Sequence, residues 1–369
     1  GKRMKHIETQ HYFTQEHVAK RNVTMKKCRG EDNPSDAGTR NLTEAKMVRL
    51  LQMIGGAGLI SLAGCRAGGV KPRLLAPAGV LPKTWTMELP DPWQLTSAKD
   101  LDQWTQADLA QADLLTCTDG WLSTLLTVAL QPIEAAPLRN QLDPLALRFL
   151  ETLGPLAAKV LPVGVSPWVL LVRRNARVDA IKSLGWQLLL DPQLQGQIVF
   201  PASPRVLIDL ADHLDQPDAL RRLRRQALTF DDRQAVNWLL KGSAKVVILP
   251  LQRCLSLLRR DPRMDVIFPH QGAPLHWTVL ARPKDTQEPL PQEWVQQAWR
   301  KPMRRRLLQD GWRAALPTSV LNADRLRLPE RWRSLVLPPE DLWNRCWSLP
   351  PLSPEQRISL GERWRASAP

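Results

Sequence analysis

Short apolar runs alternate with amphipathic segments along most of the chain after about residue 70. The apolar runs have the length of single β-strands, and the segments between them carry apolar residues at helical spacing. The predicted strands are residues 73–76, 113–117, 197–200, 245–249 and 264–268, and the predicted helices include 205–226, 232–240, 251–260 and 354–365. Strands and helices that alternate in this way predict an α/β fold with mostly parallel sheets.

The segment 186–210 contains the clearest junction between a strand and a helix. A turn at Gly196 leads into a buried strand, and a short loop then opens a new helix. In open α/β sheets, ligands bind at the carboxyl ends of strands, where helix N-termini present unpaired N–H groups. We therefore expect Ala202, Ser203 and Arg205 to contact a ligand. Arg205 suits an anionic group such as a carboxylate or phosphate, or its stem simply covers the helix surface.

A second junction of the same form follows the predicted strand 113–117. Asp119, Gly120 and Trp121 stand between this strand and a predicted helix at 122–129. Asp119 is either an N-cap for that helix or a ligand contact. Trp121 offers an aromatic ring at the same place, so all three residues join the candidate site.

Residues 157–173 contain two short β-rich runs that are separated by Gly164 and by Ser166-Pro167. Such runs predict strands that cross between two lobes. The corresponding division is 70–165 for the first part of lobe 1, 166–275 for lobe 2, and 276–369 for the return to lobe 1 with C-terminal helices.

The N-terminal region has a different composition. Residues 1–46 are polar and lack apolar periodicity, which predicts either disorder or an extension upstream of a true start at Met47. Residues 47–65 combine a basic residue, a short apolar run and a small-residue site, which is typical of a secretory signal too short to span a bilayer. Its ending, Leu-Ala-Gly-Cys65, resembles the bacterial lipobox and predicts a lipid on Cys65; a buried helix with an incidental cysteine is the alternative.

The composition gives the chain a basic net charge, and its motifs argue against disulfide, zinc and common catalytic sites. The chain carries 51 Lys and Arg against 36 Asp and Glu, a net charge of +15, but the arginines are spread along helices and not gathered with aromatic residues. A solvated basic exterior explains this better than a nucleic-acid surface. The five cysteines have neither disulfide nor zinc spacing. GxSxG, HExxH, P-loop and helix-opening GxGxxG motifs are absent, so we expect no enzyme, no metal and no cofactor.

Three segments in order resemble the bacterial periplasmic solute-binding proteins of ABC transporters, and specifically the spermidine/putrescine-binding branch, in lipoprotein form. They are GWQLLLDPQLQGQIVFPASPRVLIDLA at 185–211, WLLKGSAKVVILP at 238–250 and VIFPHQGAPLHWTVLARP at 266–283. The resemblance implies an α/β, two-lobed periplasmic binding protein-like fold (type II) with lobes joined by crossover strands. It also implies a small-molecule solute, ABC permease subunits as partners, and a periplasmic, lipid-anchored location.

The polyamine pattern is largely replaced in this chain. A polyamine needs carboxylates around its ammonium groups and aromatic faces along its methylene chain. Where this branch places acidic residues in the second-lobe loop, the chain has Ser203 and Val206. In the return strand, where an aromatic residue and an acid are expected, it has His276 and Thr278, with Trp277 between them.

The candidate ligand-binding set is therefore Asp119, Gly120, Trp121, Ser203, Arg205, His276, Trp277 and Thr278. The predicted solute is a polyamine or another small charged compound, delivered to an importer without chemistry. A binding-protein-derived interaction module that has lost its solute site is an alternative, and a basic nucleic-acid binder is a further one.

Overall fold

The computed structural model describes residues 71–98, 109, 111–122, 129–174, 182–349 and 351–369. By its internal contacts the chain divides into the units 1–69 and 70–369, and every described residue belongs to the second unit. The predictions for residues 1–46, for the signal segment with Cys65, and for most of the helix at 122–129 therefore fall outside the described residues.

The described strands form one hydrogen-bonded network in the order β2-β1-β3-β10-β5-β8-β6-β7, with β4 and β12 added to β10, and β9 and β11 added to β5. Their bounds are β1 Arg73–Pro77, β2 Gln94–Ala98, β3 Leu114–Thr118, β4 Leu130–Gln131, β5 Val160–Arg173, β6 Ile198–Val199, β7 Ala227–Thr229, β8 Val246–Pro250, β9 Met264–Ile267, β10 Pro274–Pro283, β11 Arg313–Ala314 and β12 Trp347–Ser348.

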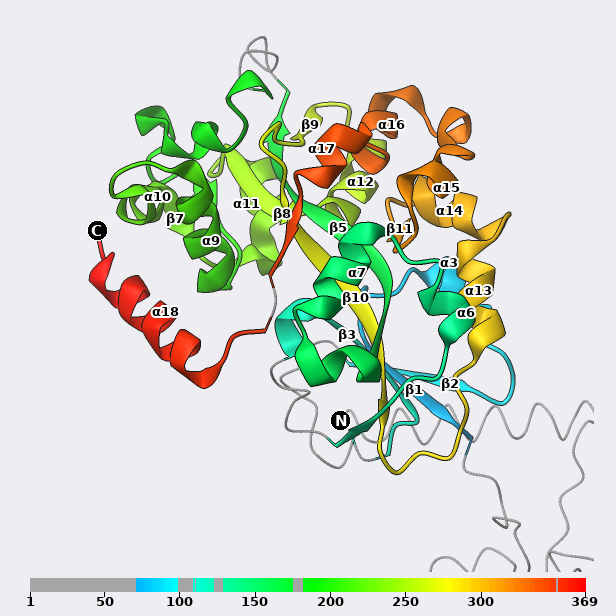
Figure 1. Ribbon diagram of the computed structural model, residues 1–369. Coiled ribbons are helices and arrows are strands. Elements are labelled where there is room, and N and C mark those ends of the chain that lie inside the picture. The colour runs from blue at the N-terminus through cyan, green and yellow to red at the C-terminus, as the bar shows by residue number, and fades with distance from the viewer. Residues whose placement is uncertain (1–70, 99–108, 110, 123–128, 175–181, 350) are drawn as a thin grey trace, which may run out of the picture. The chain divides into compact units, whose positions relative to one another are not determined.

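Strand β5 belongs to two sheets and so divides the network into two lobes (Figure 1). Up to Pro167 it pairs with β10, whose other edge pairs with β3, and β3, β1 and β2 run parallel to one another. From Trp168 onward it pairs with β8 and β9, and β8, β6 and β7 form the parallel part of the second sheet. The chain thus crosses between lobes in β5 and returns from β9 to β10, as the predicted α/β, two-lobed fold requires.

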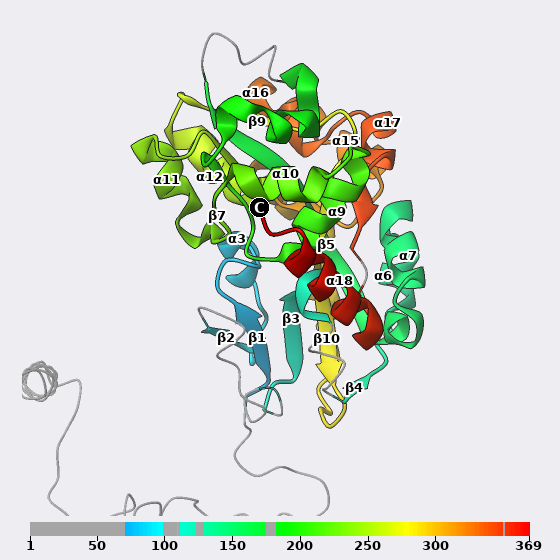
Figure 2. The same cartoon turned by 90° about the vertical axis from the view of Figure 1, so that its left-hand side faces the viewer.

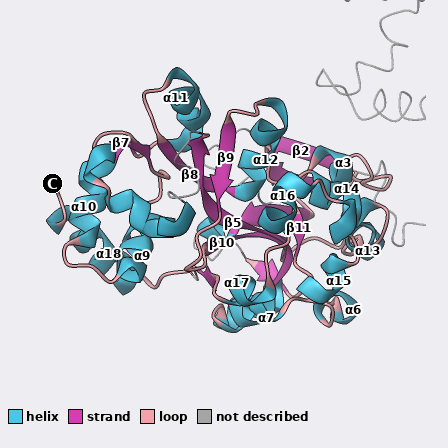
Figure 3. Cartoon of the chain, turned by 90° about the horizontal axis from the view of Figure 1, so that it is seen from above, coloured by secondary structure: helices cyan, strands magenta, loops and turns pink. Residues whose placement is uncertain are grey.

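The helices cover both lobes (Figure 3). In chain order the α-helices are α3 Lys83–Thr86, α6 Ala136–Arg139, α7 Pro144–Glu151, α9 Pro204–Leu214, α10 Ala219–Gln226, α11 Ala235–Lys241, α12 Leu251–Arg260, α13 Gln292–Trp299, α14 Met303–Gln309, α15 Thr318–Asn322, α16 Glu330–Val336, α17 Glu340–Asn344 and α18 Pro354–Ala366. None of the helices in the described part of the chain is both long enough and apolar enough to cross a bilayer.

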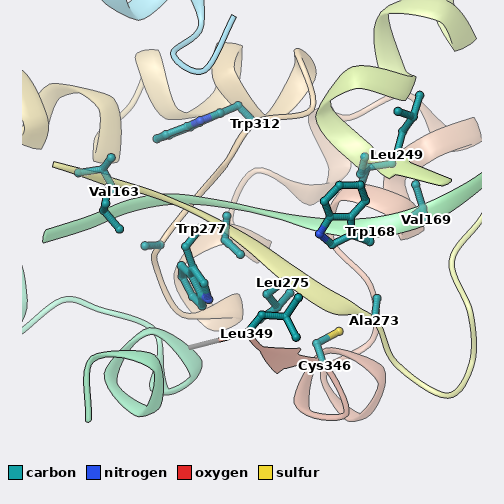
Figure 4. Packing of buried hydrophobic residues seen from close by; sticks show 14 of the residues in the cluster. Val163, Trp168, Val169, Leu249, Ala273, Leu275, Trp277, Trp312, Cys346 and Leu349 are labelled. Carbon is teal, nitrogen blue, oxygen red and sulfur yellow. The ribbon is translucent and has the colours of Figure 1, made fainter. Parts of the chain in front are cut away.

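The prediction of two separate runs in 157–173 is wrong, because Val160–Arg173 is one continuous strand whose residues are nearly all buried. Gly164 does not end a strand; its missing side chain leaves room for the indole of Trp312. Successive residues of a strand face opposite sides of the sheet. Trp312 accordingly lies on the opposite side of the β5 and β10 ribbons from Trp277, which pairs with Val165 in the register (Figure 4).

Tryptophans organise the packing around Trp312. Trp85 of α3 stacks on Trp294 of α13 with ring centroids 4.3 Å apart, and each indole N–H donates to the backbone carbonyl of the other residue, at 3.0 and 3.1 Å. Trp312 packs against Trp85 at 5.1 Å. Buried aromatic pairs of this kind contribute about 0.5–1.5 kcal/mol beyond the area they bury, so this cluster holds α3, α13 and the start of β11 together.

The segment from β12 through α18 connects the lobes a third time. β12 pairs with β10 of the first lobe, but the indole N–H of Trp347 donates to Asp209 of α9 at 2.6 Å, and its ring stacks on His213 at 3.7 Å. α18 then packs against α9 and α10 of the second lobe (Figure 2). There Trp364 lies under the Arg224 guanidinium, 4.1 Å from its ring centroid. We name residues 347–366 the interlobe strap.

Substituting Gly164 tests the close approach of Trp312. A Cβ at residue 164 would lie 2.2 Å from a ring carbon of Trp312, which is 1% exposed. We expect Gly164→Ala to lower the free energy of unfolding by about 1–3 kcal/mol, the usual cost of overpacking a core, as measured by urea denaturation. Gly361→Ala in α18, where a Cβ would meet nothing within 4 Å, is the matched control and should not destabilise. Equal stability of the two variants would contradict this packing.

Replacing Asp209 tests the strap through the pH dependence of stability. Burial is the largest effect on the pKa of Asp209 and raises it above the ordinary 3.8, while the hydrogen bond from Trp347 and the charges of His213 and Arg205 act to lower it. A carboxyl whose pKa is raised on folding stabilises the folded state below about pH 4 and loses that contribution as the pH rises through the folded-state pKa.

We therefore expect the stability of Asp209→Asn, relative to the unsubstituted protein, to improve as the pH rises above about 4, measured by denaturation at a series of pH values. Asp215→Asn, at the exposed end of the same helix, is the control and should follow the original pH profile. If the stability difference between Asp209→Asn and the unsubstituted protein stayed constant with pH, the pKa of this carboxyl would not be raised as its burial requires.

Candidate ligand-binding cleft

The two strand–loop–helix junctions of the sequence face each other across one cavity between the lobes. β3 ends at Thr118 and leads directly into the short 3-10 helix Asp119–Trp121, and β6 leads through residues 200–203 into α9. The cavity has a volume of about 390 Å³, within the range of small-molecule sites. Its walls are Thr118, Asp119, Gly120, Trp121, Trp168, Pro201, Ala202, Ser203, Arg205, Val206, Asp232, His276 and Leu349.

Asp119 anchors the first-lobe wall. Its carboxylate accepts the backbone N–H of Trp277 at 3.2 Å and lies 3.1 Å from Nδ1 of His276. Only 5% of the Asp119 side chain is exposed, against 27% for His276. The N-cap position of the 3-10 helix Asp119–Trp121 belongs to Thr118. The hypothesis that Asp119 caps a helix at 122–129 concerns residues that lie mostly outside the described part of the chain. In the described structure Asp119 joins β3 to the start of β10 and holds the imidazole of His276 at the cavity.

Trp277 and Thr278 do not line the cavity, although the sequence placed them in the candidate set. Strand alternation turns Trp277 away from His276. There it stacks on Phe149 of α7 at 5.2 Å and donates to the Ser348 hydroxyl at 2.8 Å. Thr278 is 5% exposed and pairs with Thr118 within the sheet. Both side chains therefore belong to the core of the first lobe, and Figure 4 shows Trp277 among its neighbours there.

Arg205 is the basic residue of the second-lobe wall. It lies in the first turn of α9, whose N-cap residue Ser203 makes no side-chain capping bond. Burial lowers the pKa of the Arg205 guanidinium, while the carboxylates of Asp119 and Asp209 act to raise it. Its interaction with Asp119 is a link across the cleft, because the two residues come from different lobes. The guanidinium stays charged, in partly desolvated surroundings that strengthen its attraction for an anion.

Several residues of the cavity wall were missed by the sequence prediction, and two of them, Trp168 and Asp232, carry an aromatic ring and a charge. Trp168 is 8% exposed, occupies the point of β5 where pairing passes from β10 to β8, and meets the ring of His276 edge-on at 5.5 Å. Asp232 follows β7 and forms an ion pair with Arg253. For Trp168 the signal was a tryptophan in a predicted crossover strand. For Asp232 there was none of this kind, because the strand β7 that precedes it was not predicted and Asp232 stood only at the start of the predicted helix 232–240.

Cysteine and metal chemistry do not account for the cavity. Cys117, Cys254 and Cys346 are buried free thiols. Within the described ranges, no cluster of three or more His, Cys, Asp or Glu side chains is suited to hold a metal ion. The cavity thus presents aromatic rings, one arginine, one histidine and two carboxylates.

Comparisons with known proteins give a likeness in structure and none in sequence. No protein-family model matches the chain, and no curated protein matches it. The TpPotD lipoprotein of Treponema pallidum is similar with a TM-score of 0.58 at 12% identity, over 80% of this chain and 99% of that one. The spermidine/putrescine ABC transporter substrate-binding protein PotD of Streptococcus pneumoniae gives 0.54 at 9% identity, over 80% and 98%.

A neighbour with a different ligand is equally similar. The binding protein AgtB of Agrobacterium tumefaciens, solved in complex with agropinic acid, gives a TM-score of 0.55 at 13% identity, over 81% of this chain and 99% of that one. At such identities the likeness concerns the fold. Residues 71–369 have the two-lobed α/β fold of periplasmic binding proteins, and the ligand has to be argued from the side chains of the cleft.

Proposed function

We propose that this protein is the cell-envelope solute-binding component of an ABC importer. The observation that carries the proposal is the cavity of about 390 Å³ at the carboxyl ends of β3 and β6, because its walls come from both lobes. A solute there contacts residues of two bodies that are joined by only a few crossing segments. Binding energy then favours one arrangement of the lobes over another, which is the signal that permease subunits require.

The structural neighbours support the same role. The proteins from Streptococcus pneumoniae and Treponema pallidum are named as an ABC transporter substrate-binding protein and as a lipoprotein, respectively. Transport needs binding and release without a reaction, and we propose that the cleft carries no catalysis. A small-molecule solute and ABC permease subunits are accordingly the proposed partners, and we propose no nucleic acid among them.

Solute binding is testable by thermal unfolding. A ligand that binds only the folded state stabilises it, by about 2.7 kcal/mol at a ligand concentration one hundred times the Kd. We expect at least one compound of a metabolite library to raise Tm, and Trp168→Ala to reduce that shift because it removes an aromatic wall of the cavity. Trp238→Ala, a 39% exposed residue outside the cavity wall, is the control. A library without any stabilising compound would favour an interaction module that has lost its solute site.

We further propose that Cys65 carries a lipid that holds the protein at the periplasmic face of a membrane. The proposal rests on residues 47–65, whose apolar run and Leu-Ala-Gly-Cys ending resemble a lipoprotein signal. In a bacterial host supplied with radiolabelled palmitate, we expect label in the unsubstituted protein and none in Cys65→Ser. Cys28→Ser should label normally. Labelling that persists in Cys65→Ser would refute the anchor at this residue.

A further inference from the structure

Both carboxylates of the cleft are already engaged by the protein. Asp119 accepts the Trp277 N–H and holds His276, as described above. Asp232 is paired with the guanidinium of Arg253, which also donates to the Asp232 backbone carbonyl at 3.0 Å, and only 16% of the Asp232 side chain is exposed. A solute ammonium group would therefore have to displace an existing partner from either carboxylate, which costs a large part of what it gains.

The charge balance of the walls also disfavours a polycation. Arg205 and Arg253 together balance Asp119 and Asp232, and His276 adds a positive charge whenever it is protonated. A diamine or triamine would bring two or more charges into this partly buried space without matching counter-charges. A solute with a single anionic group would instead share the guanidinium of Arg205 with Asp119, because this group has five N–H donors and its planar fork matches a carboxylate.

The remaining walls fit a compact apolar body. Trp121 of the first lobe and Trp168 at the crossing of β5 supply two indole rings. Pro201, Val206 and Leu349 supply the aliphatic surface. These uncharged groups line the same cavity as Arg205, so one part of the solute would be bound by charge and another by apolar contact.

We infer that the cleft binds a compact solute that carries one carboxylate and no net positive charge, with Arg205 holding the carboxylate and Trp121 and Trp168 enclosing the body. This inference rests on the proposed solute-binding role. The ligand class follows from two observations: Asp119 and Asp232 already have partners in the protein, and Arg205 lies on the cavity wall. The fold accommodates an acid, since the Agrobacterium tumefaciens neighbour was solved with agropinic acid.

The test is a binding panel read by thermal unfolding and by isothermal titration calorimetry. One arm contains neutral amino acids with aliphatic and aromatic monocarboxylates, and the other contains putrescine and spermidine. We expect stabilisation by at least one compound of the first arm and by neither polyamine. Stabilisation by the polyamines alone would overturn the ligand class while leaving the proposed function intact. No stabilisation by either arm would also overturn the ligand class, and the metabolite library would then decide the proposed function.

The role of Arg205 is tested with the compound that binds best. Arg205→Gln removes the charge and should weaken binding about tenfold to one-hundredfold, the usual effect of losing a charge-assisted hydrogen bond. Arg205→Lys keeps the charge without the fork and should give an intermediate Kd. Arg225→Gln, exposed on α10 of the same lobe and outside the cavity wall, should bind normally.

Because Arg205 is half-buried, the Tm of each variant without ligand is measured first to check that it folds. If Arg205→Gln is unfolded at the assay temperature, the Kd of Arg205→Lys alone decides whether Arg205 holds the carboxylate. Two results would show that the carboxylate is held elsewhere. One is an Arg205→Lys variant with the same Kd as the unsubstituted protein, and the other is a folded Arg205→Gln variant with the same Kd as Arg225→Gln.

Discussion

The sharing of β5 between two sheets is the constraint on which the rest of the described structure depends. A buried strand has to satisfy its backbone N–H and C=O groups on both edges. β5 pairs with β10 and β11 before Trp168, and with β8 and β9 from Trp168 onward. This exchange defines the lobes, places the cavity at their junction, and brings an indole ring to it. Gly164 and Trp312 show how tightly the strand is held on the first-lobe side.

The cleft combines charged groups that satisfy one another before any ligand arrives. Asp119 spans from the end of β3 to the start of β10, and Asp232 is held by Arg253 of α12. Such internal pairing preserves the shape of the walls and lowers the cost of burying charge. It also changes the chemistry that the fold offers to a solute, because carboxylates engaged in structural bonds select against cations. In the proposed solute-binding role, ligand preference would thus follow from the partners of the acids as well as from their number.

Motion between lobes has to involve the interlobe strap. Two crossings alone, β5 and the passage from β9 to β10, would leave a hinge on one side. Here Trp347 and α18 add contacts from β12 to α9 and α10, and Asp209 lies one helical turn beyond Arg205 in α9. A change at the cleft arginine is therefore close to the bond that ties the strap to the second lobe.

The sequence by itself determined the α/β class, the two strand-to-helix junctions and part of the cavity wall, because apolar periodicity and turn residues are local properties of the chain. Asp119, Gly120, Trp121, Ser203 and Arg205 could be found in this way, His276 was found through the family resemblance, and all six lie around one cavity. Only the tertiary structure decided that Trp277 and Thr278 face the core, that Trp168 and Asp232 complete the walls, and that Asp119 is held by the start of β10. Those outcomes depend on which strands become neighbours and on which side of a sheet each side chain falls, and pairing between segments distant in sequence is not encoded in local pattern.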